Sequence, residues 1–169
     1  MASTIGDVIT PGNEKAFTVR DTKPGALQDL APQYKKLLSD PVTASLTTLS
    51  EKGEMQVTPV WVGNDGTYLE LNSVRGRLKD RNLRRNGKVT LLFMNPANPY
   101  HWMSIKHTVA REVSEDDPVE GPRVTEHLDK IWTKYTGNPP PYGLRDPAID
   151  EKRVLFICNV DRIATFGKP

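Results

Sequence analysis

Asn72-Ser-Val-Arg-Gly-Arg-Leu-Lys-Asp-Arg-Asn-Leu-Arg-Arg-Asn-Gly87 is the stretch from which the architecture of this chain can be worked out. It follows the alternating segment Thr67-Tyr-Leu-Glu-Leu71 and precedes the apolar run Val89-Thr-Leu-Leu-Phe-Met94, and both patterns indicate strands. Ser73 can cap the start of a helix, and Gly87 can end one. The sequence therefore predicts a short helix held between two strands.

The predicted helix is strongly basic. Asp80 is its one acidic residue, set against the cations Arg75, Arg77, Lys79, Arg81, Arg84 and Arg85. Arg77 and Lys79 fall in the first turn, where unpaired N–H groups and the helix dipole favour an anion such as phosphate. Leu78 and Leu83 are expected to anchor the helix, and Asn82 to bond the backbone or a ligand. A solvated basic surface and a nucleic-acid patch are the alternatives.

The bulk properties indicate one globular domain. The chain has 169 residues, a net charge of +2 and a single cysteine, Cys158. Because the cations are concentrated in one segment, the composition favours a local anion site over a general nucleic-acid surface. A lone cysteine fits a reducing cytoplasm, and Cys158 is expected in the core. No signal peptide or membrane span is predicted, so no membrane partner is expected.

The order of the predicted elements is typical of a mainly β protein with flanking helices. Residues 1–25 form a polar N-terminal extension, and residues 26–169 form a single domain. Helices are expected over Leu27–Leu38 and Pro122–Tyr135, besides the basic one, and a long loop over Thr136–Asp150. The predicted strands are Thr43–Leu49, Met55–Val62, Thr67–Asn72, Lys88–Met94, Tyr100–Val113 and Arg153–Ile163. Short strands joined by hairpin turns predict an antiparallel sheet closed into a small barrel, with Pro59 at an edge, bulge or ligand-facing bend.

The basic stretch, with Val57-Thr-Pro-Val-Trp-Val62 before it and Val89-Thr-Leu-Leu-Phe93 after it, resembles a known signature. It is similar to that of the flavin/deazaflavin oxidoreductases, the pyridoxamine 5'-phosphate oxidase-like split β-barrels, and among them the branch that uses coenzyme F420. The resemblance implies an FMN-binding-like, six-stranded antiparallel split β-barrel. It also implies a homodimer with two cofactor sites at the interface.

The same resemblance implies the cofactor-binding residues. Gln56, Thr58, Pro59 and Val60 are expected at the ring, Asn72 and Ser73 near the ribityl chain, and Arg77, Lys79, Arg81 and Asn82 near the phosphate. Trp102 is expected to reach the cofactor of the partner subunit. Coenzyme F420 ends in an oligoglutamate tail, whereas FMN ends in one phosphate, so cations beyond the need of one phosphate favour F420.

No other catalytic or metal motif competes with this interpretation. His101 and His107 would lie about 20 Å apart on a regular strand, and there is no cysteine cluster, so no metal site is predicted. The sequence identifies no catalytic residue; Tyr100, Lys106 and Tyr142 are weak candidates for a proton donor. This absence fits an enzyme whose cofactor performs the chemistry.

The predicted function is therefore hydride transfer from reduced coenzyme F420 to a small unsaturated organic substrate. The loop Thr136–Asp150 is a candidate cover for that substrate. The alternatives are an FMN-dependent oxidase-like flavoprotein, a cofactor-binding protein without turnover and, ranked last, a nucleic-acid binder.

Overall fold

The structure, a computed structural model, describes residues 17–21 and 25–169, and within them three helices and eight strands. The helices are α2 (Pro32–Ser39), α3 (Leu78–Arg85) and α4 (Gly121–Thr136). The strands are β1 (Phe17–Asp21), β2 (Ala44–Leu49), β3 (Met55–Val60), β4 (Val62–Asn64), β5 (Leu69–Val74), β6 (Lys88–Asn95), β7 (Asn98–Ser114) and β8 (Arg153–Phe166). No helix in these ranges combines the length and apolarity needed to cross a membrane.

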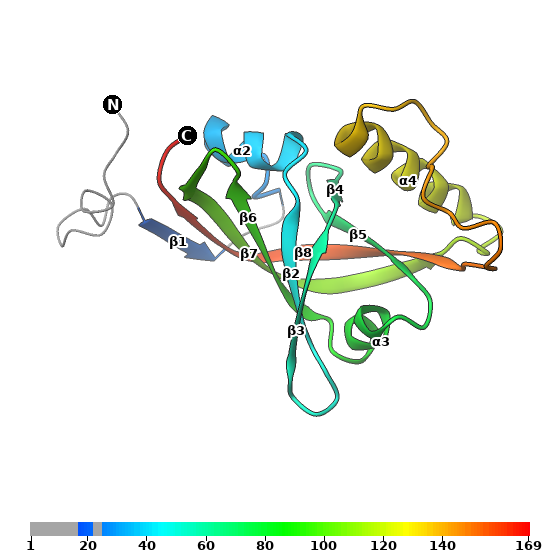
Figure 1. Ribbon diagram of the computed structural model, residues 1–169. Coiled ribbons are helices and arrows are strands. Elements are labelled where there is room, and N and C mark those ends of the chain that lie inside the picture. Colours follow the sequence, from blue (N-terminus) through cyan, green and yellow to red (C-terminus); the bar gives the residue numbers. More distant parts are fainter. Residues whose placement is uncertain (1–16, 22–24) are drawn as a thin grey trace.

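All strand pairs are antiparallel, in the order β3-β2-β6-β7-β8-β5-β4, with β1 added against β8. β3 and β4 stand at opposite ends of this order, yet Trp61 alone separates them in the chain. The sheet must therefore curl until its two ends meet, which produces the barrel seen around β2, β7 and β8 in Figure 1. Pro59 lies in the edge strand β3, so the prediction of an edge position is confirmed.

The expected number of six strands is wrong for the described residues, for two physical reasons. The predicted strand Met55–Val62 bends at Trp61 and divides, because β3 pairs with β2 whereas β4 pairs with β5. The second added strand is β1, which lies in the predicted N-terminal extension and pairs with β8 from Phe17↔Phe166 to Asp21↔Arg162. The rest of that extension, residues 1–16 and 22–24, lies outside the described residues.

Two apolar clusters hold the fold together. The larger fills the barrel and includes Leu46, Leu91, Phe93 and Phe156, all nearly inaccessible to solvent. The smaller lies between α4 and the outer face of β7 and β8; it consists of Val113, Val124, Leu128, Ile131, Leu155 and Ile157. Successive residues of β8 thus belong alternately to the larger and the smaller cluster, as expected for a strand covered on both faces. Cys158 lies in the barrel core, as predicted, and burial raises its pKa to about 12.

Helix α3 begins at Leu78, later in the chain than a helix capped by Ser73 would begin. Ser73 continues β5, where it pairs with Val154 of β8, so the prediction that it caps the helix is wrong. The turn comes at Gly76, whose φ of 82° suits a residue without a side chain. The buried Asp80 carboxylate then accepts the Gly76 N–H at 2.8 Å and secures the turn. Leu83 anchors the helix as predicted, whereas Leu78 is 43% exposed.

The other two helices differ from prediction only at their ends. Helix α2 begins at Pro32 instead of Leu27, with proline in its first turn, although Leu27 and Leu30 remain buried. Helix α4 matches the predicted amphipathic helix and stops at Gly137, which adopts a left-handed φ of 73°. Figure 1 shows α4 lying over β5 and the adjoining end of β8, with α3 near the β2–β3 hairpin.

Candidate functional site

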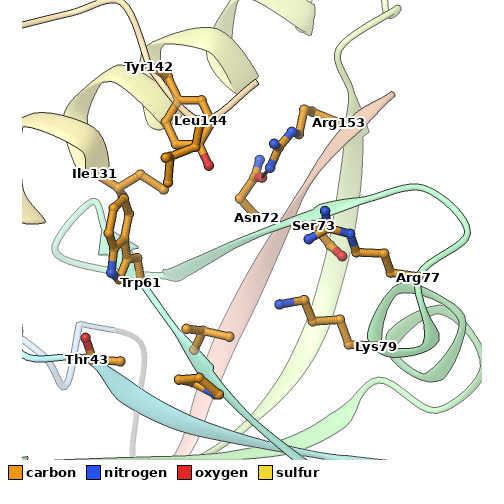
Figure 2. A pocket seen from close by; sticks show the side chains of 12 residues that line it. Thr43, Trp61, Asn72, Ser73, Arg77, Lys79, Ile131, Tyr142, Leu144 and Arg153 are labelled. Atoms are coloured by element: carbon orange, nitrogen blue, oxygen red, sulfur yellow. Dashed lines mark hydrogen bonds between the residues drawn. The ribbon is translucent and has the colours of Figure 1, made fainter. Parts of the chain in front are cut away.

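A cavity of about 270 Å³ opens where the bent β3–β4 segment, β5, the start of α3, the start of β8 and the loop after α4 come together. Its lining residues are Thr43, Pro59, Val60, Trp61, Asn72, Ser73, Arg77, Lys79, Ile131, Tyr142, Leu144 and Arg153. Figure 2 shows that the labelled cations and the labelled aromatic and aliphatic side chains come from opposite sides of this space. The cavity is therefore two-sided in its chemistry.

The polar side consists of three cations. Arg77 and Arg153 share the carboxylate of Glu151, with 3.4 Å between Arg77 Nη2 and Glu151 Oε1. Lys79 has no acidic partner among the described residues. Burial, followed by the positive charges of Arg77 and Arg153, lowers the pKa of the Lys79 ammonium group. A negatively charged ligand would offset this unfavourable concentration of charge.

On the apolar side, ring contacts hold Trp61 and Tyr142 in place. The Trp61 ring stacks on Tyr135 with 5.0 Å between ring centroids and an interplanar angle of 5°. Tyr142 meets Trp132 edge-on at 5.8 Å, and its backbone N–H donates to Asp129 Oδ1 at 2.8 Å. Ile131 and Leu144 complete this side. A flat, largely apolar molecule can lie against such a surface.

Two buried donors at the cavity wall have no hydrogen-bond partner among the described residues. They are Asn72 Nδ2 and Arg153 Nε. Both atoms donate and neither accepts, and buried polar groups are nearly always satisfied in folded proteins. The missing partners are therefore acceptors, such as the oxygens of a phosphate, carboxylate or carbonyl group. The cations and the apolar surface thus fit a phosphorylated cofactor with a planar ring, and the two donors fit an acceptor oxygen of a bound ligand.

The sheet register brings the polar side together. Val74 of β5 pairs with Arg153 of β8, and Asn72 pairs with Leu155 two positions farther along. Arg153 and Asn72 are therefore diagonal neighbours on one face of the sheet, and Arg153 Nη1 donates to Asn72 Oδ1 at 3.2 Å. The turn at Gly76 then directs the chain into α3, which supplies Arg77 and Lys79.

The structure brings six of the predicted cofactor-binding residues to this cavity: Pro59, Val60, Asn72, Ser73, Arg77 and Lys79. Five others do not line it: Gln56, Thr58, Arg81, Asn82 and Trp102. Trp102 stacks on Phe166 with 5.8 Å between ring centroids. Thr58 is half-buried on β3, and Arg81 donates to the Gly76 carbonyl at 2.9 Å.

Asn82 and Gln56 belong to one internal hydrogen-bond network. Asn82 Nδ2 donates to Thr48 Oγ1 at 3.1 Å and to Gln56 Oε1 at 3.3 Å. Asn82 is 2% exposed, so helix α3 is tied to the β2–β3 hairpin through a buried contact. The expectation that Asn82 bonds the backbone or a ligand is replaced by this side-chain network, which positions the helix that carries Arg77 and Lys79.

A second, wider groove of about 880 Å³ lies along α3. Its cations are Lys52, Arg75, Arg81, Arg84 and Arg85, and its acids are Glu51, Glu54 and Asp80. Arg75 is already paired with Asp80 at 3.2 Å and Glu112 at 2.8 Å. Arg81, Arg84 and Arg85 are exposed. The basic stretch therefore contributes charge to two depressions.

Arg153 and Leu144 line the cavity although the sequence did not single them out. Both belong to the C-terminal part of the chain, far from the basic stretch, and only the β5–β8 pairing and the loop after α4 bring them to the site. Arg153 had one sequence signal: a charged residue opens an apolar strand, Arg153–Phe166. The loop 137–150 lines the cavity through Tyr142 and Leu144. No group of three potential metal ligands occurs in the part of the chain that the structure describes.

Comparisons with known proteins agree with this fold. The family model described as pyridoxamine 5'-phosphate oxidase matches residues 30–166. A solved F420 reductase is 25% identical, with a TM-score of 0.64, and the alignment covers 79% of this chain and 98% of that protein. A search of curated proteins gave no match.

Two more distant structures share the fold alone. A putative pyridoxamine 5'-phosphate oxidase from Listeria innocua is 19% identical, with a TM-score of 0.54 and coverage of 78% and 94% of the two chains. The heme storage protein HutZ from Vibrio cholerae is 12% identical, with a TM-score of 0.61 and coverage of 82% and 96%. The barrel, the two-sided cavity and the match over residues 30–166 lead to one assignment: the chain belongs to the pyridoxamine 5'-phosphate oxidase family, within the flavin/deazaflavin oxidoreductase superfamily.

Proposed function

We propose that this chain is a cytoplasmic reductase that transfers a hydride from reduced coenzyme F420 to a small unsaturated organic substrate. The observation that carries the proposal is the two-sided cavity, in which Arg77, Lys79 and Arg153 face an aromatic and aliphatic surface. A cofactor with a flat ring and a phosphate matches both sides. When bound, the reduced deazaflavin supplies a hydride from its ring carbon C5.

The chain's own residues bind and orient the cofactor in this proposal. Arg77 and Lys79 hold the phosphate, because a guanidinium fork and an unpaired ammonium group suit phosphate oxygens. Ser73 and Asn72 lie beside the ribityl chain, with the Asn72 amide also facing the substrate end of the cavity, and Pro59 and Val60 lie at the ring. Gln56 and Asn82 join β3 to α3 from behind the cavity.

Coenzyme F420 is preferred to FMN on two grounds. The similarity to a solved F420 reductase extends over 79% of this chain. The groove along α3 also offers Lys52, Arg81, Arg84 and Arg85 to an extended anionic tail, although Glu51 and Glu54 line it as well. FMN has no such tail and would leave that groove unused. FMN remains the second candidate, since the matching family model is that of pyridoxamine 5'-phosphate oxidase.

A homodimer is the proposed assembly. Strand β3 is a sheet edge whose outward side chains include Met55, 78% exposed, and Val57, 62% exposed. An exposed apolar edge strand favours pairing with another chain. A second copy placed there would enlarge the cavity, which at about 270 Å³ is slightly smaller than typical cofactor sites. Trp102 of one copy is proposed to reach the cofactor of the other.

Turnover of the full-length protein tests the proposal. The protein is mixed with reduced F420 and cyclohexenone, and oxidation of the cofactor is followed by its absorbance. We expect oxidation that depends on both protein and enone. Tight binding of F420 without oxidation by any enone or quinone would instead identify a cofactor-binding protein, and turnover with reduced FMN alone would identify a flavoprotein.

A further inference from the structure

We propose that Arg153 and Asn72 form a substrate-binding centre that donates hydrogen bonds to a neutral carbonyl oxygen. This inference rests on the proposed function and deepens it, because it assigns the substrate end of the same cavity. The centre lies on the face of the sheet that α4 covers, whereas Arg77 and Lys79 come from α3. The cavity therefore has two polar groups on different elements, which meet at Glu151 because that acid pairs with both Arg77 and Arg153.

Arg153 is fixed before any ligand arrives. Its side chain is 7% exposed, its Nη1 donates to Asn72 Oδ1 at 3.2 Å, and its Nη2 is paired with Glu151. The guanidinium carbon also lies 5.2 Å from the centre of the Tyr142 ring. An arginine held on three sides loses little freedom when it binds a ligand, which favours specific recognition.

The unmet hydrogen bonds of this centre define the ligand's chemistry. Arg153 Nε and Asn72 Nδ2 are buried donors without a partner among the described residues, so the ligand must supply an acceptor. In the proposed complex the cofactor phosphate would offset the charges of Arg77 and Lys79. Glu151 offsets the charge of Arg153, so a carboxylate substrate would find no uncompensated cation there and would lie close to that acid. A neutral carbonyl oxygen satisfies the donors without this repulsion.

The neighbouring side chains define the rest of the ligand. Tyr142 contacts Arg153, whereas Leu144 and Ile131 line the cavity from the side opposite the centre. Gly143 keeps the loop close to the helix, because a Cβ there would meet Trp132 at 2.8 Å. The substrate class is therefore a small planar molecule whose apolar body carries a conjugated carbonyl group.

The test uses three probes that share a phenyl ring: acetophenone, ethylbenzene and benzoate. Their binding to the full-length protein, saturated with F420, is measured by ligand-observed NMR. We expect acetophenone to bind about fivefold more tightly than ethylbenzene, the ratio of one net hydrogen bond, and benzoate to bind no more tightly than acetophenone. Arg153→Met should abolish the preference for acetophenone while changing the affinity for F420 less than Lys79→Ala does.

Three results would overturn the inference. The first is equal binding of acetophenone and ethylbenzene to the wild-type protein. The second is a preference that survives in Arg153→Met. The third is benzoate binding more tightly than acetophenone, which would assign the centre to an anion. If Arg153→Met does not fold, Arg153→Lys replaces it, since lysine keeps the charge but removes Nε; it should lose the preference, and retention would count against the centre.

The proposed function and this inference can fail separately. If the wild-type protein binds neither F420 nor FMN, the proposed function fails, and the same three probes are then compared on the protein alone. If F420 binds but the carbonyl preference is absent, the cofactor assignment stands and the substrate centre is withdrawn.

Discussion

Asn82 of helix α3 donates a hydrogen bond to Thr48 of strand β2 across 3.1 Å, at a point where both residues are 2% exposed. This contact fixes the helix that carries Lys79 against the hairpin that carries Pro59. The two halves of the cavity thus depend on one buried polar pair that lies outside the cavity itself.

Asn82→Ala should destabilise the protein by about 1–3 kcal/mol, because it leaves Thr48 Oγ1 and Gln56 Oε1 without their shared donor. The free energy of unfolding is measured by urea titration. Asn86→Ala is the control: this half-buried residue directly follows the same helix and accepts one N–H, from Lys88, so its loss should cost less. Equal losses in the two variants would mean that the network does not support the helix.

Lys79→Ala and Arg77→Ala should each weaken cofactor binding by about 1–3 kcal/mol, the range for hydrogen bonds to charged groups. Calorimetric titration of the wild-type and variant proteins with F420 measures the change. Lys35→Ala, an exposed lysine of α2, controls for the loss of one positive charge. Unchanged affinity in both cavity variants would remove these residues from the phosphate site.

Glu70 should make the fold sensitive to acid. Burial opposes its charged form, but hydrogen bonds from His127 at 3.1 Å and Arg123 at 2.8 Å outweigh it and lower the pKa to about 2. A lowered carboxyl pKa means that the unfolded chain binds the proton first, so stability is lost as the pH falls from about 4.5 to about 2. Urea unfolding at several pH values should show this loss in the wild-type protein and less of it in Glu70→Gln. Glu126→Gln, on the exposed face of α4, should behave as the wild type.

Lys134 should make stability depend on pH in the alkaline range, in the same direction as Glu70 does in the acid range. Its Nζ donates to the carbonyls of Leu38 and Val62, and burial lowers its pKa to about 8 despite the nearby charge of Asp40. Between about pH 8 and pH 10.5 the unfolded chain therefore holds more protons than the folded one, and the contribution of Lys134 to stability increases with pH. The difference in unfolding free energy between wild type and Lys134→Met should grow over this range. Lys130→Met, on the exposed side of α4, should show no such growth.

The sequence predicted the elements whose signals are local. The hairpin turn between the predicted strands Met55–Val62 and Thr67–Asn72 was correct because side-chain bonds within the turn stabilise it; for example, the Gly66 N–H donates to Asn64 Oδ1 at 3.1 Å. The predicted helix Pro122–Tyr135 matches α4 to within one residue at each end, because its periodic apolar residues face one cluster. Six of the eleven proposed cofactor residues line one cavity, and all six belong to the basic stretch or to the predicted strand Met55–Val62.

The sequence did not predict the features that depend on pairing between distant segments. Ser73 has the side chain of a helix cap, but pairing with Val154 extends β5 through it. Asn82 is surrounded by cations in the sequence, yet it points to Thr48 and Gln56 on another hairpin. Arg153 reaches Asn72 only because of the β5–β8 register, and register is decided by the whole sheet.

A cofactor titration tests the central claim most directly. The purified protein is titrated with F420 and with FMN in parallel, at two salt concentrations, while the fluorescence of Trp61 at the cavity is followed with that of the other tryptophans. We predict micromolar or tighter binding of F420, at least about tenfold weaker binding of FMN, and a loss of affinity at higher salt. Tighter binding of FMN, or binding of neither cofactor, would contradict the proposed function.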